Sequence, residues 1–176
     1  MIKVFSFRPE FFNNNGDQGN LEALSYFTKQ PLSFVGLDEA DLVLIGDGSR
    51  AAIREHEAEL LAMLPLLRER YSKGLPTLIV GSAYEFYLER LPLVEQPSFG
   101  ERVSEFRNVT ADGIIVKGYR NSELVSEDLV LFGSFIGTTL FGPVLAKNPG
   151  LLERIAKALN LDVQISAEER EWISKL

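Results

Sequence analysis

The feature that most constrains the fold is a repeated order along the chain: a short apolar segment, a glycine-containing turn, and then a segment with helical spacing. The clearest apolar segment is Thr77–Val80, which consists of apolar or β-branched residues between Pro76 and Gly81. Such a run predicts a strand that is buried on both faces. Because strands that alternate with helices form a parallel sheet covered by helices, the sequence predicts a three-layer α/β fold with a mainly parallel sheet.

Other segments extend this pattern. Further strands are predicted at Ile2–Phe7, Leu32–Val35, Asp41–Ile45, Gly113–Lys117 and Leu129–Phe135. Helices are predicted from about Asn20, over Arg50–Tyr71, from near Ala83, over Pro149–Leu161 and, after a capping-box sequence that begins at Ser166, at the end of the chain. The centre of the sheet is expected to hold Val4, Phe5, Leu42, Leu44, Leu78, Ile79 and Val80.

The chain shows no repeat, no low-complexity tract and no clear domain boundary, so residues 1–176 are expected to form a single domain. The connection Leu91–Gly100 contains two prolines and is expected to run over the surface. No apolar run approaches the roughly 20 residues that a membrane-spanning helix needs. The first residues show no export signal, and we therefore expect a cytoplasmic protein.

The residue types that are missing restrict the chemistry. The chain has no cysteine and one histidine, His56. This excludes a cysteine nucleophile, disulfides, thiolate zinc sites and iron–sulfur clusters, as well as histidine-rich metal sites. With 18 basic and 25 acidic residues the net charge is −7, so the basic footprint of a nucleic-acid-binding protein is absent. No cofactor is predicted.

Three glycine-containing turns, at residues 16–20, 46–50 and 81–85, each follow a predicted strand and lead into a predicted helix. Ligands of open α/β sheets bind at the carboxyl ends of the strands, and backbone N–H groups at helix starts favour anions. Three such turns at one edge of the sheet therefore predict a binding site there. The alternative is that the glycines only make tight turns between strands and helices.

The turn after Thr77–Val80 has the small residues of a nucleophile elbow, a sharp strand-to-helix turn that presents a nucleophilic side chain. Ser82 is the candidate nucleophile in this turn, and it would need a base within hydrogen-bond reach. His56 lies between Glu55 and Glu57 and is expected on a solvated helix face. We therefore expect no Ser82–His56 pair.

Four segments carry a resemblance to a known family. They are residues 16–20 (Gly-Asp-Gln-Gly-Asn), 41–48 (Asp-Leu-Val-Leu-Ile-Gly-Asp-Gly), 74–85 (Gly-Leu-Pro-Thr-Leu-Ile-Val-Gly-Ser-Ala-Tyr-Glu) and 137–149 (Gly-Thr-Thr-Leu-Phe-Gly-Pro-Val-Leu-Ala-Lys-Asn-Pro). These segments resemble the glutamine amidotransferases of the cobyric acid synthase type, and most of all the glutaminase subunits of lipid II isoglutaminyl synthases. The resemblance extends from the N-terminus to about Gly150 and implies a class I glutamine amidotransferase-like, flavodoxin-like fold.

The same resemblance implies that the catalytic groups are missing. The family's cysteine nucleophile falls on Gly81, and its general-base histidine falls on Phe141. Residues 118–122 (Gly-Tyr-Arg-Asn-Ser) depart from the family's Gly-x-Glu-Asn-His as well. Glycine and phenylalanine provide neither a thiolate nor a proton shuttle, so glutaminase activity is expected to be absent. Arg107 lies where this branch places an arginine for the glutamine carboxylate, although it has the alternative of a surface charge.

Three functions remain open. The chain could be a catalytically degenerate subunit that binds or regulates a Mur-ligase-like or synthetase partner. It could be a different enzyme whose cleft is lined by Asp17, Asp47, Arg50, Ser82, Tyr84 and Glu85. In that case Asp17, Asp47 and Glu85 are candidate Mg²⁺ ligands, with turn and helix-cap roles as the alternative for the two aspartates. It could also bind glutamine or another amino acid through Arg107 and the groups near Gly48 and Ser82.

For the subunit hypothesis, the candidate docking surface is the connection Leu91–Gly100 together with the loops beside the elbow. Phe86, Tyr87 and Phe99 would be its apolar anchors, with burial in the core as their alternative. A geometric expectation also follows from the resemblance. If Gly81 occupies the elbow, Gly81 and the ring of Phe141 should lie close together across the cleft.

Overall fold

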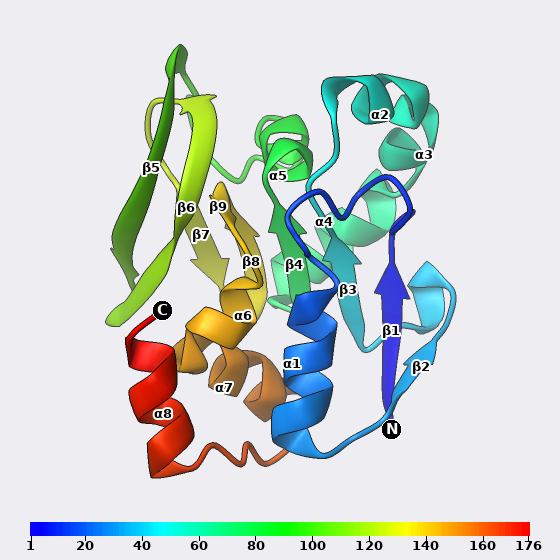
Figure 1. Ribbon diagram of the computed structural model, residues 1–176. Helices are drawn as coiled ribbons and strands as arrows, with labels where there is room; N and C mark the ends of the chain where they lie inside the picture. The colour runs from blue at the N-terminus through cyan, green and yellow to red at the C-terminus, as the bar shows by residue number, and fades with distance from the viewer.

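A parallel sheet with helices on both faces forms the body of the protein in the computed structural model, which describes residues 1–176 (Figure 1). The sheet has six strands in the order β2-β1-β3-β4-β8-β7, and β7 runs antiparallel to β8. The bounds are β1 (Ile2–Ser6), β2 (Leu32–Phe34), β3 (Leu42–Ile45), β4 (Thr77–Val80), β7 (Leu129–Phe132) and β8 (Phe135–Thr138). The predicted three-layer α/β fold is confirmed.

Successive side chains of the central strands point into two different cores, as the strand period of two requires. Leu42 and Leu44 face one core with helices α1 (Gly19–Thr28), α6 (Val144–Lys147), α7 (Pro149–Ala158) and α8 (Ala167–Ser174). Val43 and Ile45 face the other core with helices α2 (Arg50–Glu55), α3 (Glu57–Ala62), α4 (Leu64–Lys73) and α5 (Ser82–Tyr87). All of the residues expected at the centre of the sheet lie in β1, β3 or β4.

The single helix predicted over Arg50–Tyr71 is wrong, because this stretch forms the three helices α2, α3 and α4. The first break is at His56, whose backbone leaves the helical region (φ −104°, ψ 15°). The second break precedes Pro65, in the first turn of α4. Proline has no N–H for a bond to the preceding turn, so it is tolerated at a helix start and not in a helix interior.

A long β-hairpin was missed by the sequence analysis, which predicted only a short strand at Gly113–Lys117. Strand β5 (Phe99–Ala111) pairs with β6 (Ile114–Leu124), and β9 (Leu140–Phe141) completes a second, antiparallel sheet in the order β5-β6-β9. Asp112 and Gly113, both with positive φ, form the two-residue turn. An Asp-Gly pair between two alternating segments is a strong hairpin signal, and it was present in the sequence.

Two other expectations need correction. The strand predicted at Leu129–Phe135 is a second hairpin, because Gly133 (φ +58°) turns the chain between β7 and β8. The connection predicted to run over the surface, residues 91–100, places the side chains of Leu91 and Leu93 in the core. Proline makes the backbone of this connection irregular, but an irregular backbone can still carry apolar side chains that are buried.

Helix α8 begins as the sequence predicted, because Ser166 accepts the Glu169 N–H while the Glu169 carboxylate accepts the Ser166 N–H. A short 3₁₀ helix, η1 (Leu37–Glu39), lies between β2 and β3. None of the helices combines the length and apolar character that crossing a bilayer requires.

Candidate functional site

Three turns meet at the carboxyl edge of the parallel sheet, where the sequence placed a site. The Asp47 N–H donates to Asp17 Oδ2 at 3.1 Å, and the Ser82 N–H donates to Asp47 Oδ1 at 2.8 Å. Asp17 therefore joins the loop after β1 to the turn after β3, and Asp47 joins that turn to the one after β4. Both aspartates therefore bind backbone N–H groups of neighbouring turns, and neither caps the helix that follows it, since Gln18 and Ser49 are the residues at those helix starts.

Gly81 occupies a sharp turn between β4 and α5, with φ +62° and ψ −126°. This conformation is accessible to glycine and strained for other residues. A Cβ added to Gly81 would lie 2.4 Å from Asp47 Oδ1 and 2.5 Å from Cε1 of Phe141. The expected closeness of Gly81 and Phe141 is confirmed, and the space in front of the turn is filled by a carboxylate and an aromatic ring.

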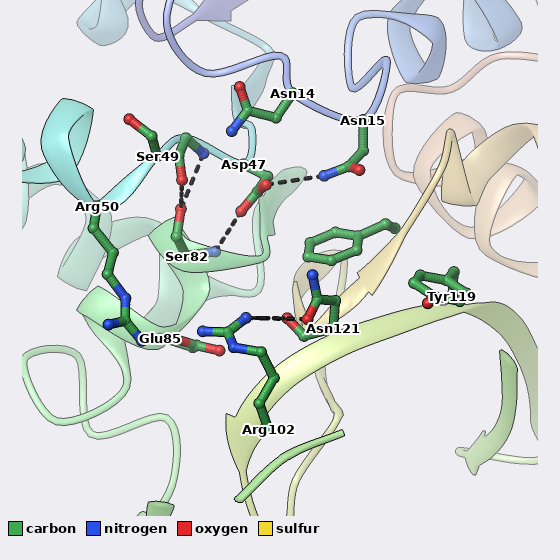
Figure 2. Close-up of a pocket in the computed structure, with 12 residues that line it drawn as sticks. Asn14, Asn15, Asp47, Ser49, Arg50, Ser82, Glu85, Arg102, Tyr119 and Asn121 are labelled. Atoms are coloured by element: carbon green, nitrogen blue, oxygen red, sulfur yellow. Dashed lines mark hydrogen bonds between the residues drawn. The ribbon is translucent and has the colours of Figure 1, made fainter. Parts of the chain in front are cut away.

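The anion at the start of α5 is the chain's own Asp47. Its carboxylate accepts the Ser82 N–H at 2.8 Å and the amide of Asn15 at 2.9 Å (Figure 2). Burial raises the pKa of Asp47, and the hydrogen bonds from Ser82 and the asparagines oppose this rise. The helix-start N–H group that was expected to favour an external anion is therefore already occupied.

Ser82 has no histidine beside it. Its hydroxyl accepts the Gly48 N–H at 2.9 Å and donates to the Gly48 carbonyl at 2.7 Å, so it ties two turns together. His56 is buried, and the prediction of a solvated histidine is wrong. The helix break turns it inward against Phe7, Phe11 and Phe12, with Nδ1 3.0 Å from Glu59 Oε1. A Ser82–His56 pair does not form, as expected.

A polar pocket of about 380 Å³ opens in front of these turns (Figure 2). Amide, hydroxyl and charged side chains line it with two aromatic rings: Asn14, Asn15, Asp47, Gly48, Ser49, Arg50, Ser82, Glu85, Arg102, Tyr119, Asn121 and Phe141. Arg50 and Arg102 both donate to Glu123 Oε1, at 2.8 and 3.1 Å. Burial raises the pKa of Glu85, which accepts the Ser122 hydroxyl. The pocket thus presents both signs of charge and many hydrogen-bonding groups.

The candidate residues divide into three groups. Gly48, Ser82 and Phe141 line the pocket, and Asp17 and Tyr84 are buried. The Tyr84 hydroxyl donates to the Glu127 carbonyl at 2.6 Å. Arg107 does not line this pocket. No group of three carboxylate or imidazole side chains is arranged to hold a metal ion, so Asp17, Asp47 and Glu85 do not form the Mg²⁺ site that was considered.

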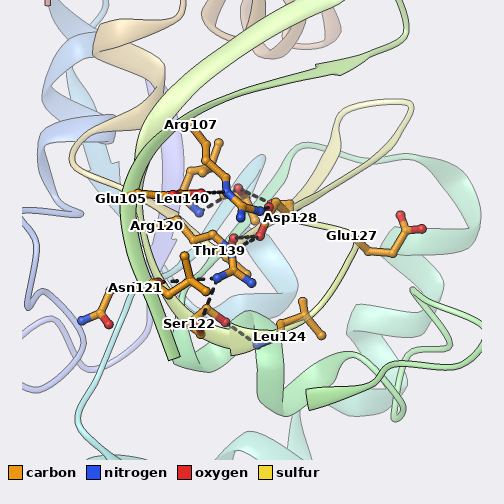
Figure 3. A network of polar contacts seen from close by, with 12 residues as sticks. Glu105, Arg107, Arg120, Asn121, Ser122, Leu124, Glu127, Asp128, Thr139 and Leu140 are labelled. Atoms are coloured by element: carbon orange, nitrogen blue, oxygen red, sulfur yellow. Dashed lines mark hydrogen bonds and ion pairs between the residues drawn. The ribbon is translucent and has the colours of Figure 1, made fainter. Parts of the chain in front are cut away.

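Arg107 belongs instead to a buried polar network that fastens the hairpin to the main sheet (Figure 3). Asp128 accepts Arg107 Nη1 at 2.8 Å, Arg120 Nε at 2.7 Å and the Thr139 hydroxyl at 2.6 Å. Arg120 is 1% exposed. Because β5 and β6 alternate between two faces, Arg107 and Arg120 point toward the body while Tyr119 and Asn121 point into the pocket.

Five pocket residues were not among those predicted from the sequence: Asn14, Asn15, Arg102, Tyr119 and Asn121. Asn14 and Asn15 lie in the loop after β1, just before the glycine-containing turn at residues 16–20. Arg102 lies on β5 of the hairpin, and Tyr119 and Asn121 lie at alternate positions of β6, which a recognised strand would have placed on one face.

The buried carboxyl of Asp17 makes stability depend on pH. Burial is the main reason that its pKa rises from 3.8 to about 6, and the Asp47 N–H opposes the rise. The folded chain therefore binds the proton more tightly than the unfolded chain, and this stabilising contribution, complete below pH 3.8, is lost as pH rises through 6. Asp17→Asn should remove this slope and raise the free energy of unfolding at pH 7 by about 2–3 kcal/mol. Urea unfolding of both chains between pH 4 and 8 measures the difference, and equal slopes would contradict the assignment.

Comparisons with known proteins identify the fold. No protein-family model matches the chain, and no curated protein matches it in sequence. Among solved structures, it is similar to a chain in the structure of PurLQS from Thermotoga maritima, with a TM-score of 0.57 and 12% identity over 90% of this chain and 100% of that one. It is also similar to a glutamine amidotransferase from Thermotoga maritima, with a TM-score of 0.51 and 17% identity over 90% and 82% of the two chains. The fold is glutamine amidotransferase-like.

Proposed function

We propose that this chain is a glutamine amidotransferase-like protein without glutaminase activity, which acts as a binding or regulatory subunit of an amide-forming ligase or synthetase. The observation that carries the proposal is the elbow. Gly81 holds the strained turn that would present a nucleophile, and Asp47 and Phe141 fill the space in which that side chain would lie. A hydrolase of this kind needs a nucleophile and a proton shuttle, and this elbow has neither.

The filled elbow also suggests that restoring the nucleophile alone would not restore glutaminase activity. Asp47 accepts the N–H of Ser82, the backbone donor next to the turn, and such donors stabilise the oxyanion in acyl-transfer enzymes. Gly81→Cys should therefore not restore activity, because the new side chain would meet Asp47 and Phe141 and the donor is occupied. Ammonia release from glutamine by the purified chain, and by Gly81→Cys, should equal that of buffer. Release at a rate typical of an enzyme would contradict the proposed loss of activity.

The partner is proposed to be a Mur-ligase-like or cobyrinate-synthetase-like protein, in line with the resemblance of residues 16–20, 41–48, 74–85 and 137–149 to the cobyric acid synthase type. Of the aromatic anchors considered from the sequence, Tyr87 is in the core and donates its hydroxyl to the Leu60 carbonyl. Phe86 is half-buried beneath the guanidinium of Arg90. Phe99 is 52% exposed, so of the three aromatic residues it is the one that a partner protein could contact most fully.

Co-expression with a candidate ligase tests the subunit role. The two proteins should purify together, and Phe99→Ala should weaken their association by about tenfold or more if Phe99 is an anchor. Phe34→Ala is a matched control, because Phe34 is 65% exposed on β2 at the opposite side of the molecule (Figure 1). Separate purification of the two proteins at micromolar concentration would remove the main support for the subunit role.

A second candidate function is the binding of glutamine or a related amino acid without turnover. The observation that favours it is the pocket, in which Arg50 and Arg102 lie near Glu85 (Figure 2). An amino acid carries a carboxylate and an ammonium group, and a site with both charges can pair with each. Calorimetric titration with amino acids should detect binding that Arg102→Ala weakens. No heat at millimolar amino acid would eliminate this candidate.

A further inference from the structure

The outer edge of β5 is a long exposed strand edge. Strand β5 ends the order β5-β6-β9, so one side of its backbone has no neighbouring strand (Figure 1). It has 13 residues, and most of them are exposed. Phe106, near its middle, is 75% exposed, the largest value among the big apolar side chains. Long exposed edges are templates for pairing with another chain, and proteins usually protect them.

The sequence around Phe106 is chemically symmetric. Residues 103–109 read Val-Ser-Glu-Phe-Arg-Asn-Val. When this segment is paired antiparallel with a second copy of itself about Phe106, each position meets a matching one. Val103 meets Val109, Ser104 meets Asn108, and Glu105 meets Arg107, with the two Phe106 rings on the axis. Such cross-strand apolar, aromatic and opposite-charge pairs stabilise antiparallel sheets.

We propose that β5 pairs with β5 of a second copy of this chain, so that residues 103–109 form a two-fold, antiparallel contact centred on Phe106. A two-fold interface must match itself. Arg107 already pairs with Glu105 and Asp128 of its own chain, and in the dimer each Glu105 would also lie opposite the second copy's Arg107, which provides that charge complementarity. The two three-stranded sheets would become one continuous six-stranded sheet, and the free backbone groups of both edges would be paired. This contact is independent of the proposed subunit role.

The geometry has a consequence for the pocket. The rings of Phe106 and Tyr119 pack edge to face, with centroids 5.1 Å apart, and Tyr119 lines the pocket. Residues opposite each other across a strand pair point to the same face. In the dimer, both pockets would therefore lie on the same side of the joined sheet, on either side of the two Phe106 rings.

Cysteine crosslinking tests the contact directly, because the chain has no cysteine of its own. Opposite residues of antiparallel strands have Cα atoms about 4.5–5.5 Å apart, within the range that a disulfide spans. Phe106→Cys should form a disulfide-linked dimer under mild oxidation at least about tenfold faster than Phe34→Cys or Ile115→Cys. The control positions are similarly exposed, at 65% and 61%, and lie outside the contact.

The register is tested by mixing two variants. Ser104→Cys and Asn108→Cys should crosslink with each other and not with themselves, because residues 104 and 108 are opposite in the proposed pairing. A self-crosslink would instead need two thiols separated by four residues along the strand, or about 13 Å. Self-crosslinking of either variant at the rate of the mixture would overturn the register.

Sedimentation velocity between about 1 and 100 µM tests the assembly without a crosslink. The wild-type chain should show a reversible monomer–dimer equilibrium, and Phe106→Lys should weaken it by at least about tenfold, because two ammonium groups would meet on the axis. Circular dichroism should show that this variant is folded, since the replaced side chain is exposed. A wild-type monomer throughout this range, or a dimer that Phe106→Lys leaves unchanged, would overturn the proposal.

Discussion

Asp128→Asn should lower the free energy of unfolding by about 3–5 kcal/mol, because it removes the charge that compensates a buried guanidinium. Arg120 is 1% exposed and donates to Asp128 Oδ1 at 2.7 Å (Figure 3). Its Nη1 also donates to the Ser122 carbonyl at 3.0 Å. A neutral amide at position 128 would leave Arg120 buried without a counter-charge. The hairpin that Arg120 belongs to should then lose its attachment to the main sheet.

The second arginine of this network is a matched control. Arg107 also donates to Asp128, at 2.8 Å, but its side chain is 33% exposed. Arg107→Ala should therefore cost only about 0–1 kcal/mol. Denaturant unfolding of both variants, at a concentration where the chain is monomeric, gives the two values. Equal costs for Asp128→Asn and Arg107→Ala would show that the buried Arg120–Asp128 pair is not the anchor.

The same pair predicts how acid affects stability. Burial raises the pKa of Asp128, but the hydrogen bonds from Thr139, Arg120 and Arg107 and the charge of Arg120 outweigh it, so the pKa lies below its ordinary 3.8. A lowered pKa means that the stabilising contribution is present above the ordinary value and lost as pH falls below it. Asp128 therefore stabilises the folded chain near neutral pH and contributes to unfolding in acid, whereas Asp17 destabilises the folded chain near neutral pH.

Gly81→Ala should lower the free energy of unfolding by about 2–6 kcal/mol, since two costs add. The first is backbone strain, because the residue has φ +62° and ψ −126°. The second is steric overlap, because the new Cβ would lie 2.4 Å from Asp47 Oδ1 and 2.5 Å from Phe141 Cε1. Asp47 cannot move away freely, because it also accepts the Ser82 N–H and the Asn15 amide.

Two other glycines separate these costs. Gly16 (φ +73°) and Gly113 (φ +75°) also have positive φ, and a Cβ added to either would meet nothing within 4 Å. Gly16→Ala and Gly113→Ala should each cost about 1–2 kcal/mol, the strain alone. The excess for Gly81→Ala in urea unfolding then measures the crowding of the elbow together with the added strain of its ψ of −126°, which lies outside the left-handed helical region. If all three variants cost the same, the elbow has room for a side chain, and the proposed loss of glutaminase activity would lose its steric argument.

The sequence by itself determined the elements whose signals are local. Thr77–Val80 is a central strand because an unbroken apolar run between Pro76 and Gly81 suits burial on both faces. The capping box at Ser166 starts α8 because both of its hydrogen bonds join residues three apart. The position of the site was also predictable, since the carboxyl ends of parallel strands meet at one edge of the sheet.

Tertiary structure decided what depends on residues far apart in the chain. Most of the side chains of β5 are polar or exposed, so its strand character depends on pairing with β6. Arg107 could have faced a ligand, but the hairpin turns it toward Asp128. His56 looked solvated between two glutamates, and the helix break turned it against three phenylalanines. Asp47 became the elbow's own anion only when the turns after β3 and β4 came together, because local pattern indicates which face a residue is on and not which distant group will meet it there.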